Sequence, residues 1–451
     1  MAFAALRSNA HGTTFWLDGG IDAAEGQSYL GFASDDAPVV TVIGEEVWLR
    51  YGGGRDIRYP GSVFSLLRDT TAAVRPDHAD GRFRLGWVGY FGYEAGVRIV
   101  GSPHHDAAQP DVALMMADRV VAVDHADRSI TLHATDDSAG SAWLATFAVT
   151  LGELAERATP DVAPPPEQLV ATLRHSRNAY LRLIEACQAE IADGNAYQVC
   201  LTNEITVSTG AGVRIDPVAT YLRLRRANPS HHGGLLQFGD HAIVSSSPEQ
   251  FLRVLPDGQM TVKPIKGTRR RGGSPTDDRM LAAELVADPK ERAENVMIVD
   301  LMRNDLGRVA ELGSLRVPAL LEVETYRTVH QLVSTVTARL PAHASWVDAF
   351  ESCFPAGSMT GAPKRSAMTI IDRLEGGARG AYAGVFGFIG CDGSVDLAMT
   401  IRTAVVGPNG ATIGTGGGIT SGSVPTAEFD ETVLKAAVIL EAVGAVLLPE
   451  A

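Results

Sequence analysis

Residues 381–446 contain three strand-like segments followed by one helix-like segment, and this order decides the fold class. The strand-like segments are AYAGVFGFIG (381–390), DLAMTIRTAVV (396–406) and ATIGTGGGIT (411–420), short apolar runs separated by turn residues. The fourth segment, TAEFDETVLKAAVILEAVGAV (426–446), has apolar residues at helical spacing. Strands that come in runs between single helices favour a mixed α+β architecture over a doubly wound parallel sheet.

The rest of the chain repeats this pattern. Short apolar stretches broken by Gly, Asp and Pro predict strands and tight turns from residue 1 to about 130. Helices are expected around 141–158, over 178–194 and over 288–309, the last with Pro289 near its start. We predict three parts: an N-terminal β-rich region at 1–160, a linker at 161–170 and a catalytic region at 171–448.

Composition and charge indicate a globular protein of the cytoplasm. The 451 residues are 45% hydrophobic and 20% charged, and no run approaches the roughly 18 apolar residues needed to span a membrane. The N-terminal residues lack the basic start and apolar core of a signal peptide. The four cysteines lie far apart without a CxxC pair, which argues against a disulfide framework or a zinc site and favours a reducing compartment.

A basic stretch, KPIKGTRRRG (263–272), stands out in an otherwise acidic chain. With 39 Lys+Arg against 53 Asp+Glu the net charge is −14, which fits nucleic-acid binding poorly because that needs a broad positive surface. The stretch is consistent with a solvated loop, with a local site for a small anion, or with a loop that carries a reactive lysine. The residues alone leave these alternatives open.

Two glutamate pairs have helical i,i+3 spacing, Glu291/Glu294 in KERAE and Glu428/Glu431 in AEFDE. This spacing places both members of a pair on one helical face, where like charges repel unless a cation lies between them. Oxygen ligands without His or Cys suit a hard cation such as Mg²⁺. Solvated helix faces are the alternative interpretation of each pair.

Two glycine-rich segments and one arginine are candidates for anion binding. In GTGGGITSG (414–422), consecutive glycines allow backbone N–H groups to converge on an anion, although a flexible surface loop would have the same composition. FPAGSMTGAPK (354–364) carries the hydroxyls of Ser358 and Thr360. Arg402 is expected within a strand, on the opposite face from Thr403.

Nine segments in a fixed order resemble the chorismate-binding enzyme family. They are SSSPEQFL, PIKGTRRRG, KERAENVMIVDLMRNDLGR, VHQLVSTV, FPAGSMTGAPKRSAM, AYAGVFGFIG, MTIRTA, GTGGGIT and AEFDETVLKA. This family includes anthranilate, aminodeoxychorismate, isochorismate and salicylate synthases. The resemblance covers residues 170–445 and extends weakly to GWVGYFGYE (86–94). It implies a large core of mainly antiparallel sheets flanked by helices, and a Mg²⁺-dependent reaction at the ring of chorismate, a dicarboxylate.

The resemblance also implies roles for individual residues. Glu294 and Glu431 match the family's metal ligands, with Glu291 and Glu428 in supporting positions one turn away. The residues that match positions holding or lining the substrate are Ser358, Thr360, Tyr382, Arg402, Gly416, Gly417, Gly418 and Lys435. Positive charge from metal, arginine and lysine would let so acidic a protein hold a dianion.

Two residues indicate a branch of the family. Isochorismate and salicylate synthases have a water-activating lysine where this chain has Gln198, so the resemblance favours the amine-using branch. Most relatives have alanine in the loop that reads PIKGT here, and Lys266 is typical of the branch that makes 4-amino-4-deoxychorismate. In the mechanism that this implies, neutral Lys266 attacks C2, the C4 hydroxyl leaves with a proton from Glu249, and ammonia then adds at C4. Neighbouring arginines and Mg²⁺ are expected to favour the neutral amine.

Some positions depart from the family pattern. Many relatives have histidine where this chain has Gln331, and the histidine of this chain, His330, lies one residue before that position. Most relatives have proline where this chain has Arg270. The N-terminal part has no clear tryptophan-binding motif, so feedback by tryptophan is not expected.

The expected partners are chorismate and a separate glutamine amidotransferase that supplies ammonia, because no Cys/His/Glu glutaminase arrangement is found. No nucleic acid or membrane partner is expected. The alternatives are component I of an anthranilate synthase or of a 2-amino-2-deoxyisochorismate synthase. Outside the enzymes, the alternative is a binding module in which PIKGTRRRG meets an acidic partner.

Overall fold

Two large β-sheets form the centre of the molecule. The computed structural model describes residues 1–8, 10, 12–21, 23–72, 80–157, 161–162, 164–165, 168–210, 212–327 and 329–448. The first sheet runs in the order β24 (Ala445–Leu447), β10 (Leu169–Leu173), β11 (Gln198–Ser208), β23 (Gly410–Ile419), β22 (Thr403–Gly407), β13 (His241–Ser247), β12 (His232–Phe238), β1 (Thr13–Asp18), β2 (Gln27–Phe32), β8 (Arg119–Asp124) and β9 (Ser129–Ala134), with β19 (Gly361–Ala362) beside β11.

The second sheet is built in the same way. Its order is β16 (Ile265–Arg270), β18 (Val329–Arg339), β15 (Gln259–Val262), β14 (Gln250–Val254), β21 (Val395–Met399), β20 (Val385–Gly390), β6 (Gly86–Phe91), β7 (Val112–Ala117), β3 (Val39–Ile43), β4 (Glu46–Tyr51) and β5 (Arg55–Tyr59), with β17 (Arg316–Thr325) beside β18. Within the described residues, pairing is antiparallel except between β10 and β24. The predicted α+β class with mainly antiparallel sheets is confirmed.

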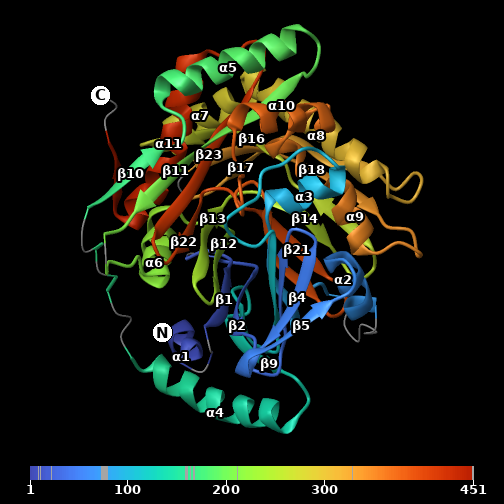
Figure 1. Ribbon diagram of the computed structural model, residues 1–451, viewed down its shortest axis with the longest axis vertical. Coiled ribbons are helices and arrows are strands. Elements are labelled where there is room, and N and C mark those ends of the chain that lie inside the picture. The colour runs from blue at the N-terminus through green and yellow to red at the C-terminus, as the bar shows by residue number, and fades with distance from the viewer. Residues whose placement is uncertain are drawn as a thin grey trace.

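Eleven α-helices and two 3₁₀ turns, counted over the described residues, surround the sheets. They are α1 (Ala2–Arg7), α2 (Val63–Ala72), α3 (Tyr93–Val100), α4 (Ser138–Ala155), α5 (Arg177–Ala192), α6 (Pro217–Ala227), α7 (Pro275–Ala287), α8 (Pro289–Gly307), α9 (Trp346–Cys353), α10 (Lys364–Glu375) and α11 (Pro425–Val443), with η1 (Gly52–Gly54) and η2 (Gly357–Met359). Helices α5, α7, α8, α10 and α11 gather at one end, opposite α4 (Figure 1). Within the described ranges, no helix combines the length and apolarity that a membrane crossing requires.

The two acidic helices begin at prolines, as the sequence predicts for one of them. Asp288 caps α8 by accepting hydrogen bonds from the backbone N–H groups of Lys290 and Glu291, and Pro289 follows at the first helical position. Helix α11 begins at Pro425 and ends at Gly444, whose left-handed backbone (φ 86°) suits glycine. Its apolar face packs on β23 and buries Ala436, Ile439 and Leu440.

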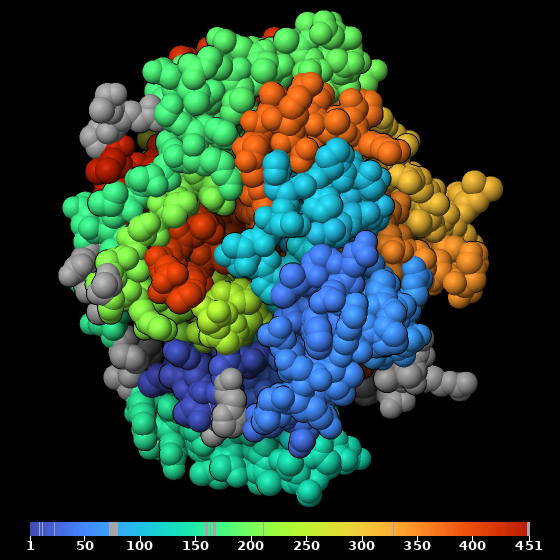
Figure 2. Space-filling model, viewed as in Figure 1, coloured from blue at the N-terminus to red at the C-terminus, as the bar shows by residue number. Residues whose placement is uncertain are grey.

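Strands of the predicted N-terminal region lie inside both sheets. Strand β1 pairs with β12, and β6 pairs with β20, so the GWVGYFGYE segment adjoins the C-terminal AYAGVFGFIG segment. A cluster of buried side chains that includes Phe15, Tyr90 and Phe386 fills the space between the sheets. The N-terminal part (blue) and the later parts (green to red) form one continuous surface (Figure 2).

The division at 1–160, 161–170 and 171–448 stays a prediction about the sequence. Residues 163, 166 and 167 of the predicted linker, and residues 158–160 at the end of the region before it, lie outside the described residues. Strand β10 already begins at Leu169.

One predicted strand is wrong in a way that matters for the site. The segment 396–406 is two strands, because β21 belongs to the second sheet and β22 to the first. The chain crosses between the sheets at residues 400–402, where Arg402 has φ 49°, a left-handed conformation that is uncommon outside glycine. A second crossing, at residues 248–249 between β13 and β14, lies beside it. Backbone hydrogen bonds from Ser246 N to Arg402 O (3.1 Å) and from Met399 N to Glu249 O (3.0 Å) join the two crossings.

Candidate active site

A β-bulge in β16 determines the position of Lys266. Ile265 pairs with Val333 and Thr268 with Gln331, so three steps along β16 match two along β18. Such a bulge redirects the side chain of the extra residue. Gly267 makes the bulge feasible: its φ is 86°, and a Cβ there would lie 2.9 Å from Leu285 Cδ1 and 3.0 Å from Glu291 Oε2.

Lys266 differs from Lys263, Arg269 and Arg271 of its stretch, which pair with carboxylates. Lys263 pairs with Glu324 at 3.0 Å, Arg269 with Asp288 at 2.7 Å and with two glutamates at 3.3 Å, and Arg271 with Asp278 at 2.7 Å. The Lys266 ammonium forms no hydrogen bond or ion pair with any described residue, yet it is close enough to Glu249 and Glu294 to affect their ionisation. Arg269 and Arg271 thus pair with carboxylates on or next to α7 and α8, and the expectation that the arginines favour the neutral Lys266 amine stays a prediction.

Glu249 lies at the crossing between β13 and β14. Desolvation raises the pKa of its carboxyl group to about 7, although Lys266 and the Ser358 hydroxyl act in the opposite direction. Ser358 Oγ is buried and has no well-formed hydrogen bond to the described residues. A carboxyl group with a pKa near neutrality, close to a lysine that has no ion-pair partner among the described residues, is an arrangement that supports proton transfer.

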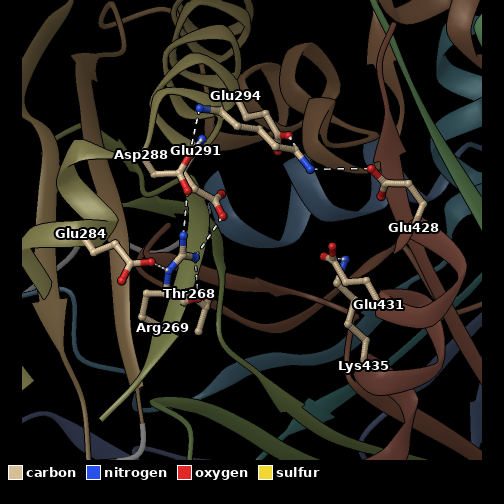
Figure 3. Close-up of polar contacts among 10 residues, drawn as sticks. Thr268, Arg269, Glu284, Asp288, Glu291, Glu294, Glu428, Glu431 and Lys435 are labelled. Atoms are coloured by element: carbon tan, nitrogen blue, oxygen red, sulfur yellow. Dashed lines mark hydrogen bonds and ion pairs between the residues drawn. The ribbon is translucent and has the colours of Figure 1, made fainter. Parts of the chain in front are cut away.

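Helix α8 uses its two glutamates differently. Glu291 accepts a hydrogen bond from Arg269 at 3.3 Å, so it is turned toward β16 (Figure 3). Glu294 has no hydrogen bond among the described residues, and burial raises its carboxyl pKa, with Lys266 and Lys290 acting against the shift. Of this predicted pair, Glu294 is the carboxylate left available for a ligand.

The two glutamates of α11 have shorter polar contacts than those of α8. Glu428 is buried and accepts a hydrogen bond from Ser423 Oγ at 2.8 Å. Glu431 pairs with Lys435 at 2.9 Å (Figure 3). Burial would raise the pKa of the Glu431 carboxyl, but Lys435 outweighs it and the pKa is lowered. Lys435 also donates to the carbonyl of Gly416 at 2.9 Å, which links α11 to β23.

The sequence did not single out Lys290, which lies among these carboxylates. Its Nζ is 3.8 Å from Glu294 Oε1 and 3.7 Å from Glu428 Oε1. Burial would lower the Lys290 pKa, but the carboxylates, Glu428 and Glu294 foremost, raise it. Its i,i+4 spacing from Glu294 was the available signal. The contact across to Glu428 depends on the packing of two distant helices and leaves no trace in the sequence.

The carboxylates fit a hard cation only in part. Within the described residues, no three His, Cys, Asp or Glu side chains are close enough to enclose an ion by themselves. Mg²⁺ commonly takes one or two protein carboxylates and completes its shell with water and substrate oxygens. An ammonium group already bridges Glu294 and Glu428, so the space between the two helices accepts positive charge.

The three glycines of the predicted anion cradle are strand residues, and the flexible-loop interpretation is wrong. Gly416, Gly417 and Gly418 pair with β11 on one edge of β23, whereas β22 pairs only as far as Ile413. Because these residues have no side chain, polar groups of neighbouring residues come close to the strand. A Cβ on Gly418 would lie 2.3 Å from Gln198 Nε2, and one on Gly417 would lie 3.3 Å from Glu428 Oε2.

Three further positions that the sequence singled out, Tyr382, Gln198 and Thr360, differ in how firmly neighbouring residues hold their side chains. The ring of Tyr382 packs on Gly414, where a Cβ would lie 2.0 Å from Tyr382 Cγ. Gln198 is buried, and its Oε1 has no hydrogen-bond partner among the described residues. Thr360 donates its hydroxyl hydrogen to Ala356 O at 3.0 Å, so it stabilises its own loop. The buried hydroxyl of Thr400, which the sequence did not single out, also lacks a partner in the described structure.

Arg402 is a half-buried cation at the crossing between β21 and β22. Its guanidinium has no hydrogen bond or ion pair with the described side chains, and desolvation lowers its pKa. Five N–H donors held away from water without acceptors are unfavourable unless a ligand supplies them. The site therefore combines an unpaired arginine, unpaired buried amide and hydroxyl groups, and a carboxylate cluster, a set that suits an anionic, oxygen-rich ligand.

Comparisons with known proteins agree with this description. The profile for chorismate binding enzymes matches residues 28–441. An aminodeoxychorismate synthase from Streptomyces griseus is 44% identical over 446 residues, which cover 94% of this chain and 60% of that protein. Aminodeoxychorismate synthase component 1 from Klebsiella aerogenes is 40% identical over 78% of this chain and 75% of its own length. The chain thus spans about 60% of the first of these relatives.

A solved structure shows the same fold. Anthranilate synthase component I from Streptococcus pneumoniae superposes with a TM-score of 0.78 at 28% identity, over 93% of each chain. With the family profile covering most of the sequence and relatives above 40% identity, the chain belongs to the chorismate-binding enzyme family.

Proposed function

We propose that this protein aminates chorismate at C4 with ammonia, in the presence of Mg²⁺, to give 4-amino-4-deoxychorismate for para-aminobenzoate synthesis. The observation that carries the proposal is Lys266, an amine without a partner among the described residues, directed by a bulge to a position near Glu249 and Glu294. Relatives named aminodeoxychorismate synthase support the same product.

Lys266 is proposed to form a transient bond to the substrate ring. Its neutral amine attacks C2, the ring double bonds shift, and the C4–O bond breaks. The hydroxyl leaves as water with the proton of Glu249, whose pKa of about 7 keeps a large protonated fraction at neutral pH. Ammonia then adds at C4, the C2–N bond breaks, and Glu249 takes back a proton from the new amine. Chorismate and ammonia become product and water, and both side chains return to their starting states.

The α11 side of the site is proposed to hold the substrate and the metal. Glu294 and Glu431 would bind Mg²⁺ directly. Glu428 lies close by, and Glu291 is held by Arg269. When bound, Mg²⁺ would supply positive charge to a ring carboxylate. Arg402, and those N–H groups of Gly416–Gly418 that point away from β11, would donate hydrogen bonds to carboxylate oxygens, because β22 pairs only as far as Ile413 and the guanidinium has no acceptor among the described side chains.

Ammonia is proposed to come from a glutamine amidotransferase partner. A glutaminase of the cysteine type needs a reactive thiolate. Burial raises the pKa of all four cysteine thiols of this chain, Cys187, Cys200, Cys353 and Cys391, which makes each a poor nucleophile. Turnover with ammonium but not with glutamine by the purified chain would support this proposal. Glutamine-dependent turnover without a partner would contradict it.

The decisive experiment is product identification after incubation with chorismate, Mg²⁺ and ammonium. Mass spectrometry and NMR would distinguish an amine at C4 from one at C2. The structural similarity to an anthranilate synthase component I keeps the C2 product as the second candidate. Anthranilate or 2-amino-2-deoxyisochorismate as the main product would overturn the proposal.

A further inference from the structure

Lys290 occupies the space between the two acidic helices, and its placement is unusual for a helical lysine. It lies in the first turn of α8, where a positive charge is unfavourable because the helix N-terminus is itself positive. Its Nζ bridges Glu294 of α8 and Glu428 of α11 at 3.8 and 3.7 Å. The carboxylates therefore hold the ammonium at this position, against the preference of the helix.

We propose that Lys290 is a displaceable internal cation: its ammonium neutralises Glu294 and Glu428 before metal binds and moves to solvent when Mg²⁺ arrives. The inference rests on the proposed metal site, because Glu294 is a proposed Mg²⁺ ligand and Glu428 lies beside that site, and both contact Lys290. It predicts that Lys290 stabilises the metal-free protein and weakens the apparent affinity for Mg²⁺.

The contacts of Lys290 permit such an exchange. Both distances are longer than a hydrogen bond, and its side chain is 59% exposed, so leaving requires only rotation toward water. Lys435 contrasts with it: its Nζ contacts Glu431 at 2.9 Å and also donates to Gly416 O at 2.9 Å, so it is held between α11 and β23. Of these two lysines, Lys290 is the one without a hydrogen bond to hold it.

An ion between the helices and the Lys290 ammonium would be close enough to repel each other strongly. Two like charges about 4 Å apart in a partly buried site disfavour each other by several times the thermal energy. Without either cation, Glu294 and Glu428 would face each other uncompensated across the helix interface. One cation or the other, but not both, is the stable arrangement.

The first test compares Lys290→Met with wild type by calorimetric titration of MgCl₂ without substrate. Because both ion pairs are long and the Lys290 side chain is largely exposed, they contribute modestly, so the variant should bind Mg²⁺ about three- to tenfold more tightly. Arg303→Met is the matched control, because it removes one exposed charge from α8 that pairs only with Asp300 among the described residues. The control should change the affinity less than twofold.

The second test separates displacement from general electrostatic repulsion. With displacement, Lys290→Met lowers the melting temperature of the metal-free protein but leaves that of the Mg²⁺-saturated protein equal to wild type. In wild type, the rate of Lys290 acylation, measured by peptide mass spectrometry, should rise several-fold as Mg²⁺ saturates, since the freed ammonium enters solvent.

Distinct outcomes overturn distinct claims. If Mg²⁺ binds wild type and Lys290→Met equally, or if Lys290 acylation falls with Mg²⁺, the displacement is wrong while the metal site stands. If Glu294→Gln and Glu428→Gln bind Mg²⁺ as wild type does, both the metal site and the displacement are wrong.

Discussion

The two sides of the site present similar residues in opposite electrostatic states. The α8 side, made by β16 and α8, contains Lys266 without an ion partner in the described structure and Glu294 with a raised pKa. The α11 side, made by β23 and α11, contains Lys435 and Glu431 in a 2.9 Å pair with a lowered glutamate pKa. The α8 side also holds Lys290, but its Nζ is 3.8 Å from Glu294, a longer and weaker contact than the 2.9 Å pair on the α11 side.

This difference suggests that one side of the site carries out the chemistry and the other binds the ligand. Groups whose charges are already satisfied keep one protonation state and suit the holding of a ligand. Groups that are desolvated and unpaired change protonation state easily and suit chemistry. Substitution of Lys266 on the α8 side should therefore reduce turnover, whereas substitutions of the metal-site glutamates and of other α11-side residues should mainly weaken binding.

The largest effect is expected for Lys266→Ala. Removing a nucleophile should lower kcat/KM on the order of 10³-fold or more, whereas losing a binding contact of about 1–3 kcal/mol costs roughly tenfold to 150-fold. Lys263→Ala is the matched control in the same stretch, because among the described residues that lysine pairs only with Glu324, so its loss should change kcat little. Steady-state rates with chorismate, Mg²⁺ and ammonium provide the measurement.

A covalent adduct would decide the role of Lys266 where kinetics are ambiguous, because ammonia can attack directly in the space that alanine leaves. Quenched wild type, given chorismate and Mg²⁺ without ammonia, should carry a ring adduct that maps to Lys266. An adduct on Lys263, or no adduct at all, would show that Lys266 is not the nucleophile, and the proposed chemical role of the α8 side would be wrong.

Glu249→Gln should have the next largest effect, about 10²- to 10⁴-fold on kcat, as for loss of a general acid. The acid must be protonated to act, and its pKa is about 7, so the wild-type rate should fall as pH rises above neutrality. The glutamine variant should lose this alkaline limb. An unchanged pH–rate profile in the variant would show that Glu249 is not the acid.

Motif order singled out Lys266, Glu249 and Arg402, whose roles stay predictions. The structure brings Lys266 close to Glu249 and joins the crossing at Glu249 to the one at Arg402 by backbone hydrogen bonds. Alternation along 396–406 predicted one strand, because it cannot report that the chain changes sheets at Arg402. The same limit hid the contact of Lys290 with Glu428, which joins helices more than a hundred residues apart.

Glutamates of the two helices should differ in how pH affects Mg²⁺ binding. Glu294→Gln and Glu431→Gln should each weaken Mg²⁺ binding about tenfold to 150-fold, the loss expected for a contact with a charged group. Because the Glu294 pKa is raised, protons compete with Mg²⁺ there, and wild-type affinity should fall as pH decreases from neutral. Glu294→Gln should flatten this dependence, whereas Glu431→Gln should keep it, since the Glu431 pKa is lowered. Calorimetric titrations with MgCl₂ at a series of pH values from neutral downward test this.

The smallest effect is expected for Gly417→Ala, which probes the α11 side without removing a charge. The new Cβ would lie 3.3 Å from Glu428 Oε2 and 3.9 Å from Lys435 Nζ, so Glu428 must shift by a few tenths of an ångström. A shift of that size should weaken Mg²⁺ binding by a factor of about two to five and leave kcat nearly unchanged, because no reacting group moves. Gly422→Ala is the control from the same glycine-rich segment, since nothing described lies within 4 Å of its Cβ position. If Gly417→Ala instead lowered kcat and left the Mg²⁺ affinity intact, the α11 side would take part in the chemistry, and the proposed division between the two sides would be wrong.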